Sequence, residues 1–217
     1  MSSDRRTGAV RQRRQSKEQP GARVRALAAE VVDAVTASGQ SLDDALKRAE
    51  EKLPASEHAL LRMLCFGTLR KYWRLKSWID VLTERPLKPA DRLVGALLAV
   101  GLFQLSGTRV PEHAAVSATV EATRLINRPK HAGLVNAILR RFMREQIVSQ
   151  PAASDEARFN HPAWMIDTLR ADWPDDWQQI LEANDERAPL WLRVNRQRIS
   201  TDGYLARLLA AGIPAAR

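Results

Sequence analysis

VPEHAAVSATVEATRLINRPKHAGLVNAILRRFMRE, residues 110–145, is the most regular helical pattern in this 217-residue chain. It predicts two helices, over residues 111–126 and 129–147. Each begins with a proline in its first turn, where the missing N–H has no helical partner to lose.

The second of these helices has an apolar face and a basic face. Val135, Ile138, Leu139 and Phe142 recur at helical spacing and predict a buried stripe. Arg140, Arg141 and Arg144 are expected to share the solvent side. Such arginines can be an ordinary solvated face, but the positive charge of this part of the chain favours a phosphate contact surface.

Four further helical patterns precede this pair. They cover residues 23–37, residues 41–52 with Ser41 as the expected N-cap, residues 57 to about 82, and residues 89–106. The third is expected to break near Gly67 or Lys76. The fourth is apolar nearly all round, which predicts a central buried helix.

Residues after 149 predict a second unit. Residues 150–158 are a Pro/Ala/Ser/Asp-rich linker, and helices are expected over residues 163–171 and 174–183. Residues 189–195, PLWLRVN, alternate as a strand. A helix capped near Ser200 then runs to residue 211, with Gly212 as its stop signal. A lone strand has no sheet partner, so residues 159–217 are expected to be the incomplete start of an α+β subdomain.

The net charge of +9 is unevenly distributed. Residues 1–21 carry +4 and predict a disordered basic arm. Residues 22–149 carry +7, whereas residues 150–217 carry −2. The part that faces a polyanion is therefore expected in the first two-thirds of the chain.

A basic-aromatic window, RMLCFGTLRKYWRLKSW, covers residues 62–78. Cations beside aromatic rings suit single-stranded RNA, whose phosphates pair with cations and whose bases stack on rings. For Tyr72 and Trp78 a core position is favoured, and for the cations both interpretations stay open. The full set of candidate RNA-binding residues is Arg23, Arg25, Arg70, Lys71, Arg74, Lys76, Arg140, Arg141 and Arg144.

The chain offers no catalytic pattern of its own. The four histidines are scattered without metal-ligand spacing, so no metal site is expected. Cys65 lies on an apolar helical face and is expected to be a core thiol rather than a nucleophile. A single cysteine forms no internal disulfide, which favours a reducing cytoplasm. No glycine-rich cofactor loop follows a strand, and the longest apolar run is too short for a membrane span of ~20 residues.

Residues 111–142 resemble the closing helices of the NusB-like family, and residues 23–37 and 56–73 resemble its earlier helices. The resemblance covers roughly residues 22–147. It implies an all-α domain of two small helical bundles packed at an angle, which binds RNA in transcription antitermination.

FNHPAW at residues 159–164 and PLWLRVN at residues 189–195 resemble the region after the NusB-like domain in RsmB-type methyltransferases. That resemblance implies an S-adenosylmethionine-dependent enzyme that makes 5-methylcytosine in small-subunit ribosomal RNA. Its cofactor-binding and catalytic-cysteine domain would follow residue 217. The 217 residues are then expected to position RNA, to bind no cofactor and to be inactive alone.

Two alternatives stay open at this point. A stand-alone NusB-like regulator of transcription would explain the helices and the charge but not residues 159–217. A helical protein-interaction module without an RNA role would explain the helices alone.

Overall fold

The computed structural model describes residues 21–186 and 188–216. The basic arm predicted at residues 1–21 lies outside the described residues except for Gly21. The chain divides into two compact units, Met1–Asp185 and Glu186–Arg217.

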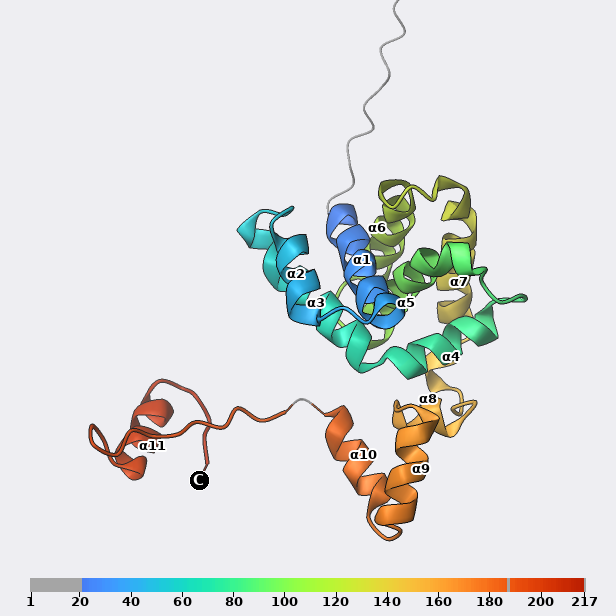
Figure 1. Ribbon diagram of the computed structural model, residues 1–217. Helices are drawn as coiled ribbons and strands as arrows, with labels where there is room; N and C mark the ends of the chain where they lie inside the picture. The colour runs from blue at the N-terminus through green and yellow to red at the C-terminus, as the bar shows by residue number, and fades with distance from the viewer. Residues whose placement is uncertain (1–20, 187, 217) are drawn as a thin grey trace, which may run out of the picture. The chain divides into compact units, whose positions relative to one another are not determined.

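Seven helices form the body of the first unit (Figure 1). Three short 3-10 turns accompany the later helices among the described residues. One precedes α5 (Pro89–Asp91), one precedes α7 (Pro129–His131) and one follows α7 (Ile147–Ser149). The seven are α1 (Ala22–Ser38), α2 (Leu42–Glu50), α3 (Ala55–Arg70), α4 (Tyr72–Leu82), α5 (Arg92–Gly107), α6 (Glu112–Leu125) and α7 (Ala132–Arg144).

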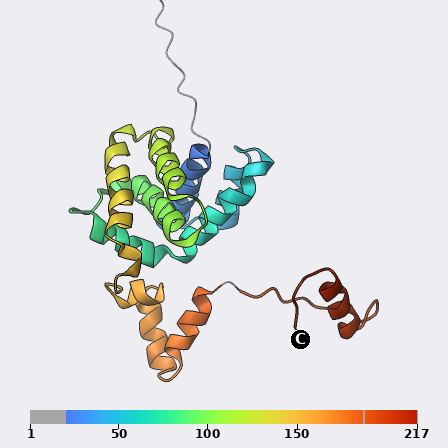
Figure 2. The same cartoon turned by 180° about the vertical axis from the view of Figure 1, so that it is seen from behind.

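Helix α5 lies at the centre of this body, as its all-round apolar sequence predicts. It packs against α1, α3, α4, α6 and α7 (Figures 1 and 2). Gly101 lets α5 approach its neighbours, because a Cβ there would lie 2.9 Å from Leu139 Cδ2 and 3.0 Å from Thr119 Cγ2. Helical residues 89–107 are long and apolar enough to cross a membrane by length and composition alone, and half of an 18-residue stretch within them is buried inside the helical body.

The long helical pattern at residues 57–82 is divided at Lys71, between the two positions expected from the sequence. Lys71 has φ −104° and ψ 19°, which ends α3 and begins α4. The carbonyl of Arg70 is thereby free of a helical partner and accepts a hydrogen bond from Asn160 Nδ2. A contact from far along the chain thus accompanies the break.

Residues 150–158, expected to be a linker, contain a helix. Helix α8 (Asp155–Phe159) begins at Ser154, whose hydroxyl accepts a hydrogen bond from the Ala157 N–H at 3.2 Å. An N-cap serine followed by two acidic residues is a helix-start signal. The interpretation as a linker was therefore wrong over this short segment.

Helices α8, α9 (Ala163–Asp172) and α10 (Trp177–Asp185) form a small cluster within the first unit. Phe159, Ile166 and Leu181 are its buried residues, and the Trp177 ring lies 5.0 Å from the Phe159 ring, edge to face. This cluster packs on α4 through α8.

The second unit contains α11 (Thr201–Ala210), as the sequence predicts. Ser200 caps it by accepting the Gly203 N–H at 3.1 Å, and Gly212 follows it in the left-handed region at φ 72°. The strand predicted at residues 189–195 is not formed in the described residues. Leu190 and Trp191 are 83% and 82% exposed, so no neighbouring strand supplies a ladder or a covered face. The α+β character expected of this segment is therefore not confirmed.

Candidate nucleic-acid interface

A basic groove lies between α7 and the segment that follows α4. It encloses about 710 Å³, and we call it the α4–α7 groove. Three arginines of the candidate set, Arg140, Arg141 and Arg144, line it together with Arg85. Its apolar lining includes Leu87, Leu134 and Ile138. Guanidinium groups beside an apolar floor can hold phosphates while the bases contact the floor.

The arginines of α7 are not equally available to a ligand. Arg144 is open, with 72% of its side chain exposed and a 3.4 Å contact to Glu145, whereas 38% of the Arg141 side chain is exposed. Arg140 is exposed and donates from Nε to Asn136 Oδ1 at 3.0 Å.

Arg141 is held within the protein. Its Nε lies 2.8 Å from Glu145 Oε1, and its Nη1 donates to the Leu82 carbonyl at 3.2 Å. The hydrogen bond from Arg141 lowers the pKa of Glu145 below its usual value, and the same contact raises the pKa of Arg141. Arg141 therefore ties α7 to α4 as well as lining the groove.

Arg85 is the groove residue that the sequence did not point to. It lies in the irregular segment between α4 and the Pro89–Asp91 turn, and it is exposed. No periodicity operates in such a segment, so only the packing of α4 on α7 brings Arg85 to the groove. A lone arginine before Pro86 carries no local signal that would have identified it.

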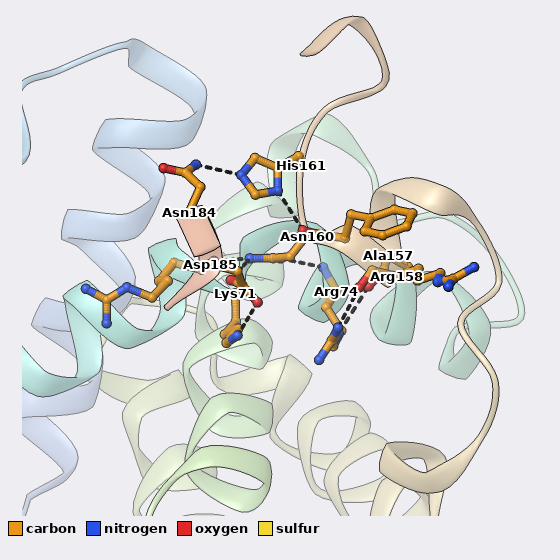
Figure 3. Close-up of polar contacts among 10 residues, drawn as sticks. Lys71, Arg74, Ala157, Arg158, Asn160, His161, Asn184 and Asp185 are labelled. Atoms are coloured by element: carbon orange, nitrogen blue, oxygen red, sulfur yellow. Dashed lines mark hydrogen bonds and ion pairs between the residues drawn. The ribbon is translucent and has the colours of Figure 1, made fainter. Parts of the chain in front are cut away.

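Two cations of the basic-aromatic window, Lys71 and Arg74, lie at a different place, a polar junction between α4 and the α8–α10 cluster (Figure 3). Arg74 donates from Nε to the Ala157 carbonyl at 3.1 Å and from Nη2 to the Arg158 carbonyl at 2.7 Å. It thus satisfies carbonyls at the end of α8, which has no helical continuation. We call this the α4–α8 junction, formed by Lys71, Arg74, Asn160, His161, Asn184 and Asp185.

Asn160 is the centre of the junction. Its Oδ1 accepts the Arg74 backbone N–H at 3.1 Å, and its Nδ2 donates to Asp185 Oδ1 at 3.0 Å as well as to the Arg70 carbonyl. It is buried and has φ 59°, a left-handed conformation that asparagine tolerates better than most residues. Lys71 forms an ion pair with the same carboxylate, that of Asp185.

His161 joins α10 to the junction. Its Nδ1 lies 2.6 Å from the Phe159 carbonyl, and its Nε2 lies 2.7 Å from Asn184 Nδ2 (Figure 3). A carbonyl only accepts, so Nδ1 carries the proton and Nε2 accepts from the amide. The ring is buried and hydrogen-bonded at both nitrogens, which is a structural role.

The remaining candidate residues are dispersed. Arg23 is exposed on α1, and Arg70 is exposed at the end of α3. Lys76 is exposed and pairs with Asp80 at 2.8 Å. Arg25 is buried. The structure therefore gathers the α7 arginines into one groove and separates them from Lys71 and Arg74, whose contact with RNA stays a prediction with a competing internal use.

Two core assignments are confirmed. Trp78 packs against the main core, its ring 5.1 Å from that of Phe142. Cys65 is fully buried, and burial raises the pKa of its thiol to about 12. Tyr72 is half-buried and lies edge to face with Trp73. In the described part of the chain, no three His, Cys, Asp or Glu side chains are grouped to hold a metal ion.

Two families match successive parts of the chain. Residues 22–144 match the NusB family. Residues 161–217 match the Methyltr_RsmF/B-like, ferredoxin-like domain.

Curated relatives match across both regions. The ribosomal RNA small subunit methyltransferase B of Klebsiella pneumoniae subsp. pneumoniae is 44% identical over 191 residues, covering 88% of this chain and 44% of the relative. The protein of the same name from Salmonella newport is 44% identical over 192 residues, with the same coverage of each chain. This chain thus spans less than half the length of these relatives. With more than half of its residues matched, the chain belongs to the NusB family, and its NusB domain is followed by an RsmF/B-like ferredoxin-like domain.

Proposed function

We propose that this chain is the RNA-binding region of a small-subunit ribosomal RNA methyltransferase. The observation that carries the proposal is the succession of a NusB domain and an RsmF/B-like domain in one chain. Relatives of that organisation bear the name ribosomal RNA small subunit methyltransferase B. Ribosomal RNA is then the partner, and the cytoplasm is the compartment.

The finer chemistry is also proposed. The reaction is methyl transfer from S-adenosylmethionine to C5 of a cytosine, with a catalytic domain that the additional length of the relatives would supply in cis. The described residues do not fit the cofactor, because they form no strand followed by a glycine-rich turn and a helix.

The contribution of this chain is to hold the RNA. The α4–α7 groove offers Arg85, Arg140 and Arg144 as cations whose guanidinium groups reach solvent. Arg141 keeps the groove in shape by its contacts with Glu145 and the Leu82 carbonyl. Phosphate contacts of this kind position an RNA without reading its bases.

A salt titration tests the groove. Arg85→Gln combined with Arg144→Gln removes two exposed cations and leaves the Arg141 contacts intact. For single-stranded RNA each phosphate contact contributes roughly 0.7 to the slope of log affinity against log salt, so the slope should fall by about 1.4. A fragment of small-subunit ribosomal RNA is the ligand, and fluorescence anisotropy is the readout.

Lys47→Gln combined with Arg48→Gln is the matched control. It removes the same charge from α2, which packs on α1 and α3 and contributes nothing to the groove. The control should keep the wild-type slope. Equal losses in both double variants would mean that only net charge matters, and unchanged binding in the groove variant would refute the interface.

A genetic test addresses the enzyme. Deletion of the gene should remove one 5-methylcytosine from small-subunit ribosomal RNA, as read by bisulfite sequencing, and residues 1–217 alone should not restore it. The alternative of a stand-alone NusB-like regulator predicts an unchanged methylation pattern. It also leaves the match of residues 161–217 unexplained.

A further inference from the structure

The α8–α10 cluster has a core separate from that of the helical body. Its buried apolar residues are Phe159, Ile166 and Leu181, and none of them belongs to the large hydrophobic core that the helical body forms. Few buried side chains stabilise a unit only weakly, and segments with few buried apolar contacts open most readily. The docking of the cluster on α4 therefore depends on the polar contacts of the α4–α8 junction.

Two hollows interrupt the surface between α4 and the segment that leads into the cluster. One encloses about 240 Å³ and is lined by Trp78 and Val81 of α4 together with residues 150–153. The other encloses about 320 Å³ and is lined by Trp73 and Lys76 of α4 together with residues at the start of α8. Closely packed interfaces leave few such spaces. Separation of the cluster from α4 therefore gives up less apolar contact than a closely packed interface would.

The junction occupies two cations that would otherwise be open to an anion. Lys71, at the break between α3 and α4, forms an ion pair with the Asp185 carboxylate. Arg74 donates to two backbone carbonyls at the end of α8, at 3.1 and 2.7 Å. These oxygens accept from the same donors that a phosphate would contact. The junction thus takes the place of a polyanion at both side chains.

The Lys71–Asp185 ion pair is open to competition. Asp185 is the last residue of α10, and the ends of helices fray. Exposure of 35% of the Lys71 side chain and 16% of the Asp185 side chain lets water and salt reach the pair. Screening weakens a partly exposed pair. An anion that arrives from solution can therefore displace this carboxylate.

We propose that the α8–α10 cluster is a gate over the cations of α4. In the closed state Asp185 occupies Lys71 and the end of α8 occupies Arg74. When the cluster separates from α4, both cations become available to RNA phosphates. The gate rests on the proposed function, since RNA is its polyanion, and it regulates how many cations the RNA meets beyond the α4–α7 groove.

Asp185→Asn tests the gate. Asparagine keeps an oxygen that accepts from Asn160 Nδ2 but removes the charge that holds Lys71. One further cation is then available, so the slope of log affinity against log salt should steepen by about 0.7 for a mixed-sequence single-stranded RNA 12-mer. Affinity at low salt should rise roughly two- to fivefold, as expected when a partly exposed ion pair no longer competes. A purely structural ion pair would leave the slope unchanged.

Two further variants attribute the change to Lys71. Asp175→Asn removes the same charge from the exposed turn between α9 and α10, outside the junction, and should keep the wild-type slope. Asp185→Asn combined with Lys71→Gln should return the slope to the wild-type value, because no additional cation remains. The gate is overturned by an unchanged slope in Asp185→Asn, by equal steepening in Asp175→Asn, or by steepening that persists in the double variant.

The gate and the groove fail differently. If Arg85→Gln with Arg144→Gln weakens binding and Asp185→Asn leaves the salt slope unchanged, the groove stands and the gate is refuted. If neither change affects binding, the proposed function fails together with the gate.

Amide hydrogen exchange without RNA tests the opening itself. Asp185→Asn should accelerate exchange in α9 and α10, whereas α1, α3 and α5 should keep their wild-type protection. Equal acceleration in all of these helices would mean that the cluster opens only when the helical body unfolds, and that result would overturn the gate.

Discussion

Substitution of Asn160 by alanine should detach the α8–α10 cluster from the helical body. The side chain makes three hydrogen bonds, to the Arg70 carbonyl, the Arg74 N–H and the Asp185 carboxylate. At about 1 kcal/mol each, their loss removes roughly 3 kcal/mol. Alanine in the left-handed conformation at φ 59° adds about 1 kcal/mol. The expected destabilisation is therefore roughly 4 kcal/mol.

A second asparagine provides the matched control. Asn127 has φ 57°, and its exposed side chain makes no hydrogen bond described in the structure. Asn127→Ala should thus lower the free energy of unfolding by only about 1 kcal/mol, the cost of placing alanine in the left-handed conformation. The free energy of unfolding of Asn160→Gly should be about 1 kcal/mol higher than that of Asn160→Ala. Both variants lack the three hydrogen bonds, but glycine adopts the left-handed region without strain.

Thermal unfolding and hydrogen exchange measure the effect together. For a chain of this size 1 kcal/mol shifts the melting temperature by roughly 2–4 °C, so Asn160→Ala should melt about 8–16 °C lower if unfolding is cooperative. If the cluster opens by itself, amide exchange should instead accelerate in α8, α9 and α10 alone. Equal melting shifts for Asn160→Ala and Asn127→Ala, with unchanged exchange in the cluster, would refute the reasoning.

Gly67→Ala should destabilise the helical body by about 2 kcal/mol or more in urea unfolding, because a Cβ there would lie 1.9 Å from Phe103 Cζ. Gly133→Ala, where a Cβ meets nothing within 4 Å, should stabilise α7 by roughly 0.5–1 kcal/mol, and the opposite order would contradict the packing. Cys65 should resist a thiol reagent at pH 8 until denaturant is added, and rapid modification of the folded chain would be inconsistent with its burial. Burial raises the pKa of the folded Cys65 thiol to about 12, so the thiol of the unfolded chain ionises at lower pH and stabilises the unfolded state. The urea midpoint of unfolding should therefore decrease between pH 9 and pH 11, and the decrease should be smaller in Cys65→Ala.

The candidate interface was partly predictable from the sequence. Helical periodicity placed Arg140 and Arg144 on the solvent side of α7, and both line the α4–α7 groove. The same periodicity could not show that Arg141 reaches the Leu82 carbonyl, because that partner lies on another helix. Arg85 was missed for a related reason: its neighbours form no repeating pattern, and only tertiary packing brings it to α7.

The basic-aromatic window shows how one pattern admits two outcomes. Its cations and rings suit RNA. In the structure, however, Arg74 donates to the backbone carbonyls at the end of α8, and Lys71 pairs with Asp185. Both partners lie far along the chain, so local sequence gives no sign of them. Arg25 is the converse case: it belongs to the candidate RNA-binding set, whereas the fold buries its side chain beside a hollow.

The sequence by itself determined the helices of residues 22–145, the central place of α5 and the buried state of Cys65. These follow from local periodicity, from proline at helix starts and from apolar composition, which act over one or two turns. Only the tertiary structure decided the break at Lys71, the α4–α8 junction, the groove and the absence of a strand at residues 189–195 among the described residues. Each of these depends on hydrogen bonds or packing between residues distant in the chain, and a strand in particular needs a partner for its backbone groups.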